Sequence, residues 1–200
     1  MNEYSLKMAR QLDTGKMERI NEAAMELIVE KGYGNASIAK IAKKAGVADG
    51  YLYRFHKSKE DMVNALLSDK ITFLIDKMKM LLQAETSITE LVKTLIKEIF
   101  TVAEEKPESI KFLYVLMHDY NFQIAVEQRL IIKDIIVSAL ERGREQQEVG
   151  KDTTVEEVFY LAVEYPIVFI NLRLKNFFGH KGWDKHDQQR VVDFCIKGLK

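Results

Sequence analysis

Helical periodicity runs along almost the whole chain and restricts its fold more than any other feature. Apolar residues recur at spacings of three and four, and no alternation with period two persists long enough to indicate a strand. With only two prolines and ten glycines in 200 residues, the chain also lacks the many tight turns of an all-β fold. At 47% hydrophobic residues it has enough apolar material for a substantial core. The sequence therefore predicts an all-α fold.

Stop and cap signals set the boundaries of the expected helices. Gly46 is expected to take the left-handed conformation between two short helices, and Ser58 with Asp61 forms a variant capping box. Residues 1–13 are expected to be a tail or a frayed helical extension, and Pro166 is expected to kink its helix. The predicted helices span residues 14–31, 37–44, 48–55, 58–83, 87–106, 107–120, 122–147, 153–178 and 187–199.

Charge is balanced over the chain but unevenly distributed. Thirty basic and thirty acidic residues give a formal net charge of zero, so the whole chain indicates neither a nucleic-acid nor a membrane partner. Between Lys31 and Lys59, however, seven basic residues stand against one acid, Asp49, and the rest of the chain is net acidic. A basic island on an acidic chain is what a small nucleic-acid-binding head on a larger body would show.

The stretch from residue 37 to residue 61 carries the strongest functional signal. Two short predicted helices joined by a three-residue turn can cross steeply only through small side chains, which Ala42 and Gly46 supply. The order Ile-Ala, Gly-Val and Leu here is typical of a helix-turn-helix, whose second helix enters the major groove of DNA. The apolar residues spaced to close a small core with the first long helix are Ile38, Ile41, Val47, Leu52 and Phe55.

The residues around the two short helices suit DNA binding. Those expected to face base edges, at the start of the second helix, are Ala48, Asp49, Gly50 and Tyr51. Basic residues within reach of phosphates are Lys40, Lys43, Lys44, Arg54, Lys57 and Lys59. The backbone N–H groups at Ser37 and Ile38 are expected to bind a further phosphate at a helix N-terminus. The alternative is a small three-helix packing unit with a solvated charged face.

A set of residues between Ile20 and Leu66 matches a known pattern. Its members are Ala23, Ala24, Leu27, Gly32, Tyr33, Ala36, Ser37, Ile38, Ile41, Ala42, Ala45, Gly46, Val47, Ala48, Gly50, Leu52, Tyr53, Lys57, Ser58, Lys59 and Glu60. They resemble the DNA-binding head of the tetracycline-repressor (TetR-like) family of bacterial regulators. The resemblance implies that Tyr53 and Lys59 contact phosphates, and that the positions of Ala48, Asp49 and Tyr51 contact bases or the groove wall.

The sequence departs from the TetR-like pattern at three places. Asp49 stands where a basic residue is frequent, and Tyr51 where a small hydroxyl residue is frequent. Both departures indicate an unusual operator. The Asp49 carboxylate either accepts a hydrogen bond from a cytosine amino group or caps the N-terminus of the second helix electrostatically. Phe55 and His56 reverse the usual order of a polar ring followed by phenylalanine, which leaves open which ring faces the core.

Aromatic and methionine side chains gather in the body of the chain, as they do in small-molecule pockets of helical bundles. The resemblance implies an effector site there, and the alternative is an aromatic core. Glu164 lies in a very apolar helix, so it needs a partner, a cationic ligand or a boundary position. The candidate effector residues are Phe100, Phe112, Met117, His118, Tyr120, Tyr160 and Glu164.

The segment from Val158 to Leu172 is the most apolar in the chain. At about fifteen residues it is too short for a bilayer, which needs roughly twenty, so no membrane partner is expected. Its apolar surface exceeds the need of one core, which predicts a homodimer whose last two helices pair with those of the partner. The candidate interface residues are Val168, Phe169, Ile170, Leu172 and Phe194.

The remaining chemistry-bearing residues carry no site. The single Cys195 excludes an intramolecular disulfide and suits a reducing, cytoplasmic location, and it is expected to be a packed thiol. His180 and His186 are expected in a solvated loop, so no metal and no cofactor are predicted. The sequence shows no spacing typical of a catalytic triad, a phosphate-binding glycine loop or a redox cysteine pair, so no enzyme is expected.

These features together predict a helix-turn-helix DNA-binding domain over residues 1–57 and a helical effector-binding and dimerisation domain over residues 58–200. The predicted function is that of a ligand-responsive transcriptional regulator, a repressor that binds a near-palindromic double-stranded operator and is released by an unidentified small molecule. The alternative is a helical small-molecule-binding protein whose head no longer binds DNA.

Overall fold

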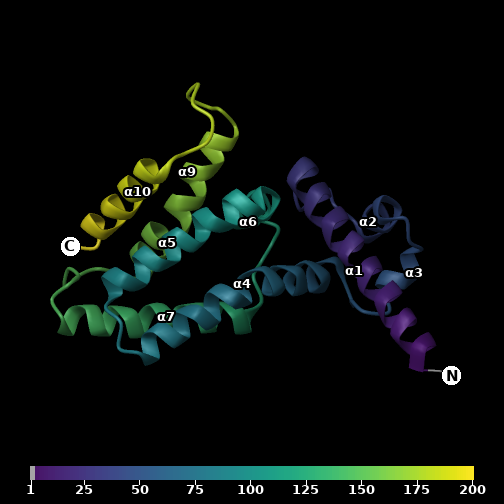
Figure 1. The fold of residues 1–200 in the computed structure, drawn as a ribbon, viewed down its shortest axis with the longest axis horizontal. Helices are drawn as coiled ribbons and strands as arrows, with labels where there is room; N and C mark the ends of the chain where they lie inside the picture. The colour runs from purple at the N-terminus through teal and green to yellow at the C-terminus, as the bar shows by residue number, and fades with distance from the viewer. Residues whose placement is uncertain (1–2) are drawn as a thin grey trace. The chain divides into compact units, whose positions relative to one another are not determined.

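The computed structural model describes residues 3–200, with side chains described from residue 15 onward. Every regular element in this range is helical, which confirms the predicted all-α class (Figure 1). Met1 and Asn2, part of the predicted tail, lie outside the described residues. The elements are α1 (Glu3–Lys31), α2 (Ile38–Ala45), α3 (Asp49–Leu52), α4 (Lys59–Gln83), α5 (Ile88–Glu105), α6 (Pro107–His118), α7 (Val126–Glu145), α8 (Val155–Phe159), the π-helical η1 (Tyr160–Glu164), α9 (Tyr165–Leu174) and α10 (Lys185–Gly198).

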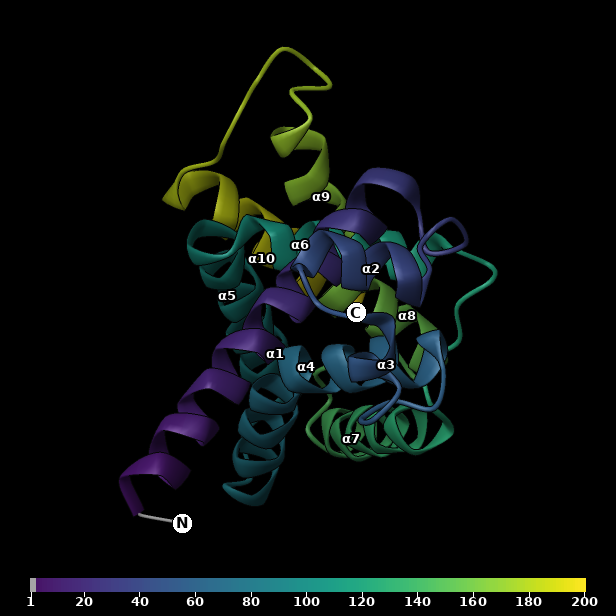
Figure 2. The ribbon, with the colours of Figure 1, turned by 90° about the vertical axis from the view of Figure 1, so that its right-hand side faces the viewer.

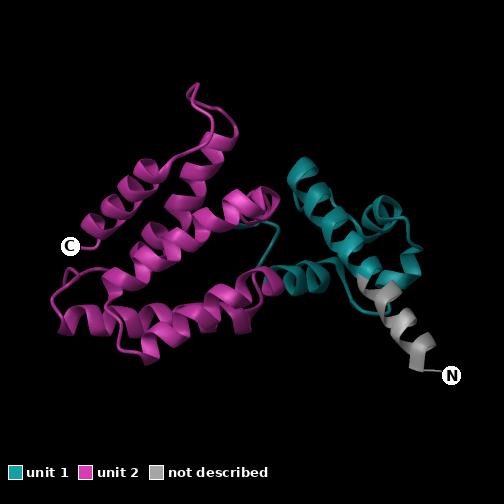
Figure 3. Ribbon diagram, in the orientation of Figure 1, with its two compact units in different colours: residues 1–67, 115–123 teal, residues 68–114, 124–200 magenta. Residues whose placement is uncertain are grey.

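The chain divides into two compact units, shown in different colours in Figure 3. Unit 1 comprises residues 1–67 together with residues 115–123, and unit 2 comprises residues 68–114 and 124–200. Helix α4 therefore contributes to both units. The functional boundary expected after residue 57 stays a prediction, because these units are defined by packing alone.

Unit 1 has the helix arrangement expected of a helix-turn-helix. Ala42 is completely buried where α2 packs against α1, so the two backbones come close. Gly46 ends α2 with a φ of 69°, a left-handed conformation that glycine adopts without strain, and its N–H bonds back to α2 carbonyls. Ile28, Ile41 and Leu52 are almost completely buried and form part of the core below α3.

Helix α3 is shorter than predicted. A helix was expected from residue 48 to residue 55, whereas α3 ends at Leu52 and the chain continues in turns. The N-cap Ala48 has no side chain that can bond the helix N-terminus. After Leu52 the N–H of Arg54 bonds the carbonyl of Tyr51 and that of Phe55 bonds Leu52, which is the tighter three-residue spacing. Only the first turn is therefore α-helical.

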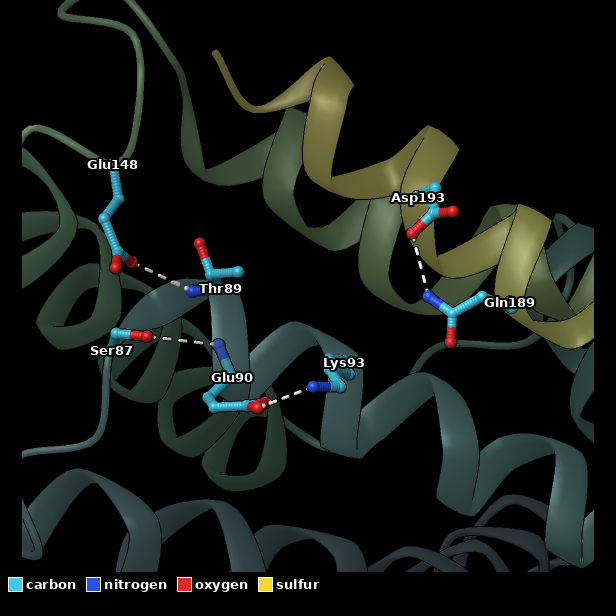
Figure 4. A network of polar contacts seen from close by, with 7 residues as sticks. All are labelled: Ser87, Thr89, Glu90, Lys93, Glu148, Gln189 and Asp193. Carbon is cyan, nitrogen blue, oxygen red and sulfur yellow. Dashed lines mark hydrogen bonds and ion pairs between the residues drawn. The ribbon is translucent and has the colours of Figure 1, made fainter.

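Unit 2 is built around α5, whose buried residues face several neighbours. Helices α7, α9, α10 and the η1 segment all pack against α5, and Phe100 in its middle is completely buried. The N-terminus of α5 is capped twice (Figure 4). Ser87 Oγ accepts the N–H of Glu90 at 3.2 Å, and Glu148 Oε2 accepts the N–H of Thr89 at 3.1 Å. The connection between α9 and α10 projects beyond both helices in two perpendicular views (Figures 1 and 2).

The long apolar helix predicted over residues 153–178 is divided into α8, η1 and α9. In η1 the N–H of Tyr165 bonds the carbonyl of Tyr160, one residue farther back than in an α-helix. Pro166 follows in the first turn of α9, where its missing N–H is tolerated. The expected disturbance near Pro166 is thus a π-helical turn. Among the described residues, no helix is long and apolar enough to cross a membrane.

Candidate nucleic-acid interface

The start of α3 presents the expected base-facing residues to solvent. Ala48, Asp49 and Gly50 are exposed and Tyr51 is half-buried, while Leu52 points into the core at 1% exposure. Asp49 lies in the first turn of α3, where a carboxylate interacts favourably with the helix N-terminus. Ala48, Asp49 and Gly50 therefore form an exposed tip at the start of α3.

An aromatic cluster lies directly after this tip. The rings of Tyr51 and Phe55 are 5.2 Å apart, and the Arg54 guanidinium lies 5.7 Å and 5.8 Å from their centroids. The Lys16 ammonium, from α1, is 5.4 Å from the Tyr51 ring. Phe55 is 45% exposed, whereas only 13% of the His56 side chain is exposed. His56 therefore takes the inward position and Phe55 the outward one, so the predicted core position of Phe55 is corrected.

The N-terminus of α2 is capped by Ser37, which precedes the helix and is not its first residue as predicted. Ser37 Oγ accepts the N–H of Lys40 at 3.3 Å, and the side chain of Ile38 is buried in the core. Only the backbone of Ser37 and Ile38 is thus suited to a phosphate. The Lys40 ammonium donates to the carbonyl of Asn35 at 2.9 Å, so it holds the turn before α2.

Two further basic residues are also engaged within unit 1. The Lys59 ammonium donates to the Tyr33 carbonyl at 2.9 Å and lies 3.9 Å from the Tyr33 ring centroid. Burial lowers the pKa of Lys59. The Lys44 ammonium pairs with Glu26 at 3.0 Å and Glu30 at 3.5 Å on α1, and the hydrogen bond with Glu26 raises the pKa of Lys44. Both lysines tie the helices of the head together.

Four further basic or phenolic residues near α3 have exposed side chains. These are Lys43, Tyr53, Arg54 and Lys57. The N–H of Lys57 donates to Asp61 Oδ2 at 2.8 Å, and the N–H of Asp61 donates to Ser58 Oγ at 3.0 Å. The predicted capping box is therefore confirmed on its serine side, while the aspartate caps one residue earlier.

The head matches a described family. The family model for "Bacterial regulatory proteins, tetR family" matches residues 20–66. The uncharacterized HTH-type transcriptional regulator YvdT of Bacillus subtilis is 36% identical over 101 residues, which cover 50% of this chain and 52% of that protein. The fatty acid metabolism regulator protein of the same organism is 36% identical over 87 residues, covering 44% and 45%. Residues 20–66 of this chain therefore match the DNA-binding head of the TetR family.

Solved structures extend the likeness to the body at the level of the fold. A TetR-family regulator from Marinobacter aquaeolei superposes with a TM-score of 0.73 at 17% identity, over 95% of this chain and 98% of the other. The fatty acid degradation regulator FadR from Bacillus halodurans gives 0.66 at 23% identity, over 92% and 97%. FadR from B. subtilis in complex with stearoyl-CoA gives 0.61 at 22%, over 92% and 100%. In sequence, the chain spans about half the length of the two B. subtilis relatives described above.

Unit 1, which contains this head, includes a segment that sequence patterns did not assign to it, residues 115–123. Asp119 Oδ1 accepts both the backbone N–H of Asn121 at 2.9 Å and its side-chain amide at 3.1 Å. Hydrogen bonds from Asn121 and from the backbone of Tyr33 hold the pKa of Asp119 below its ordinary value. The rings of Tyr33 and Phe122 meet edge to face at 5.0 Å. No short-range signal marks this contact, because its partners are far apart in sequence.

The predicted effector residues are divided between the two units. Phe100 and Phe112 are completely buried in unit 2, and Phe100 packs against Phe169 and Trp183 at 6.1 Å and 5.7 Å. This part of the aromatic set is core.

The other predicted effector residues are divided between the units. Met117, His118 and Tyr120 belong to unit 1, whereas Tyr160 and Glu164 belong to unit 2. Tyr120 is fully exposed, so its ring lines no enclosed cavity. Tyr160 is 50% exposed, and Glu164 is half-buried and has an interaction partner.

The predicted interface residues differ in how much of each side chain is exposed. Ile170 is completely buried within unit 2, so its side chain has no surface for a partner, and this prediction is corrected. Phe169 is half-buried beneath the Arg173 guanidinium at 5.1 Å. Val168 and Leu172 are half-buried, and Phe194 is 54% exposed. The helical pattern placed the first four of these residues on one segment but did not distinguish the buried face of that segment from its exposed face.

The remaining residues considered from sequence lie apart from the head. Cys195 is buried, and burial raises the pKa of its thiol to about 12. His180 and His186 are exposed around the α9–α10 connection. Within the described part of the chain, no group of three or more His, Cys, Asp or Glu side chains could hold a metal ion.

Proposed function

We propose that this protein is a homodimeric transcriptional repressor of the TetR family that binds a near-palindromic DNA operator and is released by a small-molecule effector. The exposed tip of α3, framed by basic residues, is the observation that carries the proposal. Unit 1 supplies both elements of a helix-turn-helix, a motif whose second helix presents its N-terminal residues to base edges, and this supports the proposal. The relatives' names describe transcriptional regulators, which supports regulation rather than catalysis as the activity of this chain.

Phosphate contacts fall to the basic residues that the head leaves exposed. Lys43, Arg54 and Lys57 surround α3 and can reach the DNA backbone without breaking an internal ion pair seen in unit 1. Tyr53, 60% exposed, can donate its hydroxyl to a phosphate. Lys59 remains a candidate only if it leaves the Tyr33 carbonyl.

The experiment for DNA binding is selection of bound fragments from a random-sequence pool, followed by titration of the selected site at several salt concentrations. A specific site with a steep salt dependence supports the proposal, since each phosphate contact adds about 0.9 to the slope of log K against log salt. Lys57→Ala should reduce the slope by about one, whereas Lys151→Ala in unit 2 serves as an exposed-lysine control. Failure to select any site would favour the alternative, a small-molecule-binding protein whose head no longer binds DNA.

A second copy would bring two heads to two half-sites. The exposed ring of Phe194 on α10 stacks on Tyr165 at 4.8 Å, and Tyr160 is also exposed on η1. Together with the apolar residues of α9, these aromatic side chains form an apolar surface. Such a surface favours pairing with the same surface of a second copy. Phe194→Glu should yield monomers in sedimentation analysis, whereas Phe178→Glu, on the α9–α10 connection, should remain dimeric. An unchanged Phe194→Glu dimer would place the interface elsewhere.

For the effector we propose a long-chain acyl thioester of coenzyme A. B. subtilis FadR binds stearoyl-CoA, and this chain shares its fold and is related to a fatty acid metabolism regulator. Within unit 2, the side-chain oxygen of Gln128 is buried and has no hydrogen-bond partner among the described residues. A ligand or water with a donor group would satisfy it. Gln128 shares the face of Ile132 and Ile136 on α7, at a spacing of four residues.

The effector is tested by adding stearoyl-CoA, coenzyme A or stearate to the DNA complex and to the protein alone. Release of DNA and a rise in melting temperature with stearoyl-CoA only would support an acyl thioester, because a ligand that binds the folded state stabilises it. Gln128→Leu should weaken this response, while Gln189→Leu on exposed α10 should not. No response to any of the three compounds would exclude this effector class.

A further inference from the structure

The aromatic pair Tyr51 and Phe55 stands out because it lies on the DNA-facing side of the head and not in its core. Phe55 is 45% exposed, and its ring lies against that of Tyr51 at 5.2 Å with an interplanar angle of 57°. The core side of the same turn is filled by Leu52 and His56. The core of the head is therefore filled without Phe55, whose ring is left at the surface.

The two rings are spaced to form one surface beside the base-facing tip. Tyr51 lies in α3 and Phe55 follows four residues later, at the end of a continuing turn. The Arg54 guanidinium lies over both rings, and the Lys16 ammonium lies near Tyr51. The surface is thus an apolar patch edged by cations, which suits an apolar group carried on a polyanion.

DNA offers one such group in the major groove. The 5-methyl of thymine is the apolar feature there, and it distinguishes a T·A pair from the other pairs through contact with apolar side chains. We propose that Tyr51 and Phe55 form an apolar wall that contacts a thymine methyl in each operator half-site, while Arg54, oriented by the two rings, binds the adjoining phosphate. This inference rests on the proposed DNA-binding function and adds the base class that the site selects.

Deoxyuridine tests the inference directly, because it lacks only the methyl group and keeps the same base pairing. Each thymine of the selected operator is replaced in turn by deoxyuridine, and the affinity of the wild-type protein is measured. We expect a loss of about four-fold at one or two positions of each half-site, which corresponds to the ~0.8 kcal/mol of one buried methyl group. At those positions, the ratio of the affinity for the thymine operator to the affinity for the deoxyuridine operator should fall to about one in Phe55→Ala.

Two further variants keep the result interpretable. Phe55→Leu retains an apolar side chain and should keep part of the ratio, and Phe178→Ala, an exposed phenylalanine of unit 2, should keep all of it. Circular dichroism of each variant checks that the head is folded. Wild-type affinity that is unchanged by deoxyuridine at every position overturns the inference. So does a ratio that persists in folded Phe55→Ala, since the methyl would then be contacted elsewhere. Absence of any selected operator would instead overturn the proposed function.

Discussion

Lys59 can be tested for two roles that make opposite predictions. The TetR-like pattern assigns its ammonium to a DNA phosphate, whereas the structure places that ammonium on the Tyr33 carbonyl at 2.9 Å and 3.9 Å from the Tyr33 ring. Replacement by methionine removes the charge and keeps most of the apolar side chain. Lys59→Met should therefore destabilise unit 1 and leave phosphate binding unchanged if the internal contacts persist in the DNA complex.

The size of the destabilisation follows from the two contacts. A hydrogen bond involving a charged group contributes about 1.5–3 kcal/mol when well buried, and the partial exposure of Lys59 reduces this to about 1 kcal/mol. The cation–π contact adds about 0.5–1 kcal/mol. The expected loss in free energy of unfolding is thus roughly 1–2 kcal/mol, or about 4–16 °C in melting temperature for a domain of this size.

The assay separates the units through the single tryptophan. Trp183 lies in unit 2 against Phe100, so its fluorescence reports the unfolding of that unit, whereas circular dichroism reports helices of both units. For Lys59→Met we expect an earlier dichroism transition, an unchanged fluorescence transition and an unchanged salt slope of DNA binding. The control Lys57→Met should leave the dichroism transition unchanged and reduce the salt slope of DNA binding. A Lys59→Met protein of normal stability whose salt slope falls by one would refute the internal role and restore the phosphate contact.

Three further predictions concern individual contacts. Asp119→Asn should lower the stability of unit 1 at pH 7; because the pKa of Asp119 is lowered on folding, the difference should shrink as the pH falls below the ordinary range of an aspartate pKa. Gly143→Ala should destabilise unit 2 by roughly 1–3 kcal/mol in denaturant unfolding, since the new Cβ would lie 2.6 Å from Ile88, whereas Gly15→Ala meets no atom within 4 Å and should not. Cys195 should react with a thiol reagent at pH 8 only on unfolding, because burial raises its pKa to about 12.

Local sequence signals were sufficient for most helix boundaries. Ser37 caps α2, Ser87 caps α5 and Gly46 ends α2, and each acts through atoms within four residues along the chain. The helix-turn-helix followed from the same short-range pattern of small and apolar residues. The length of α3 did not follow from local signals, because residues 53–55 carry no helix-breaking signal. Their tight turns depend on the burial of Leu52 and His56.

Contacts between distant parts of the chain account for the rest. A lysine at residue 59 looks identical in sequence whether it binds a phosphate or the Tyr33 carbonyl, 26 residues away. The inclusion of residues 115–123 in unit 1 depends on Asp119 meeting the turn after α1, for which the sequence has no periodic signature. The predicted effector set is divided between the two units for the same reason, since aromatic content does not specify which unit a side chain enters.

The exchanged order of Phe55 and His56 has a physical cause that involves a third residue. An inward histidine buries a polar ring, which is unfavourable unless a polar partner accompanies it. Asp61 supplies one, because its Oδ2 lies 4.0 Å from His56 Nδ1 while also accepting the N–H of Lys57. With the inward place taken by His56, Phe55 is left on the outer side against Tyr51. The carboxylate that caps the start of α4 therefore also fixes which ring faces outward. If Phe55 contacts DNA as proposed, Asp61→Ala should alter operator preference through Phe55 without itself touching a base.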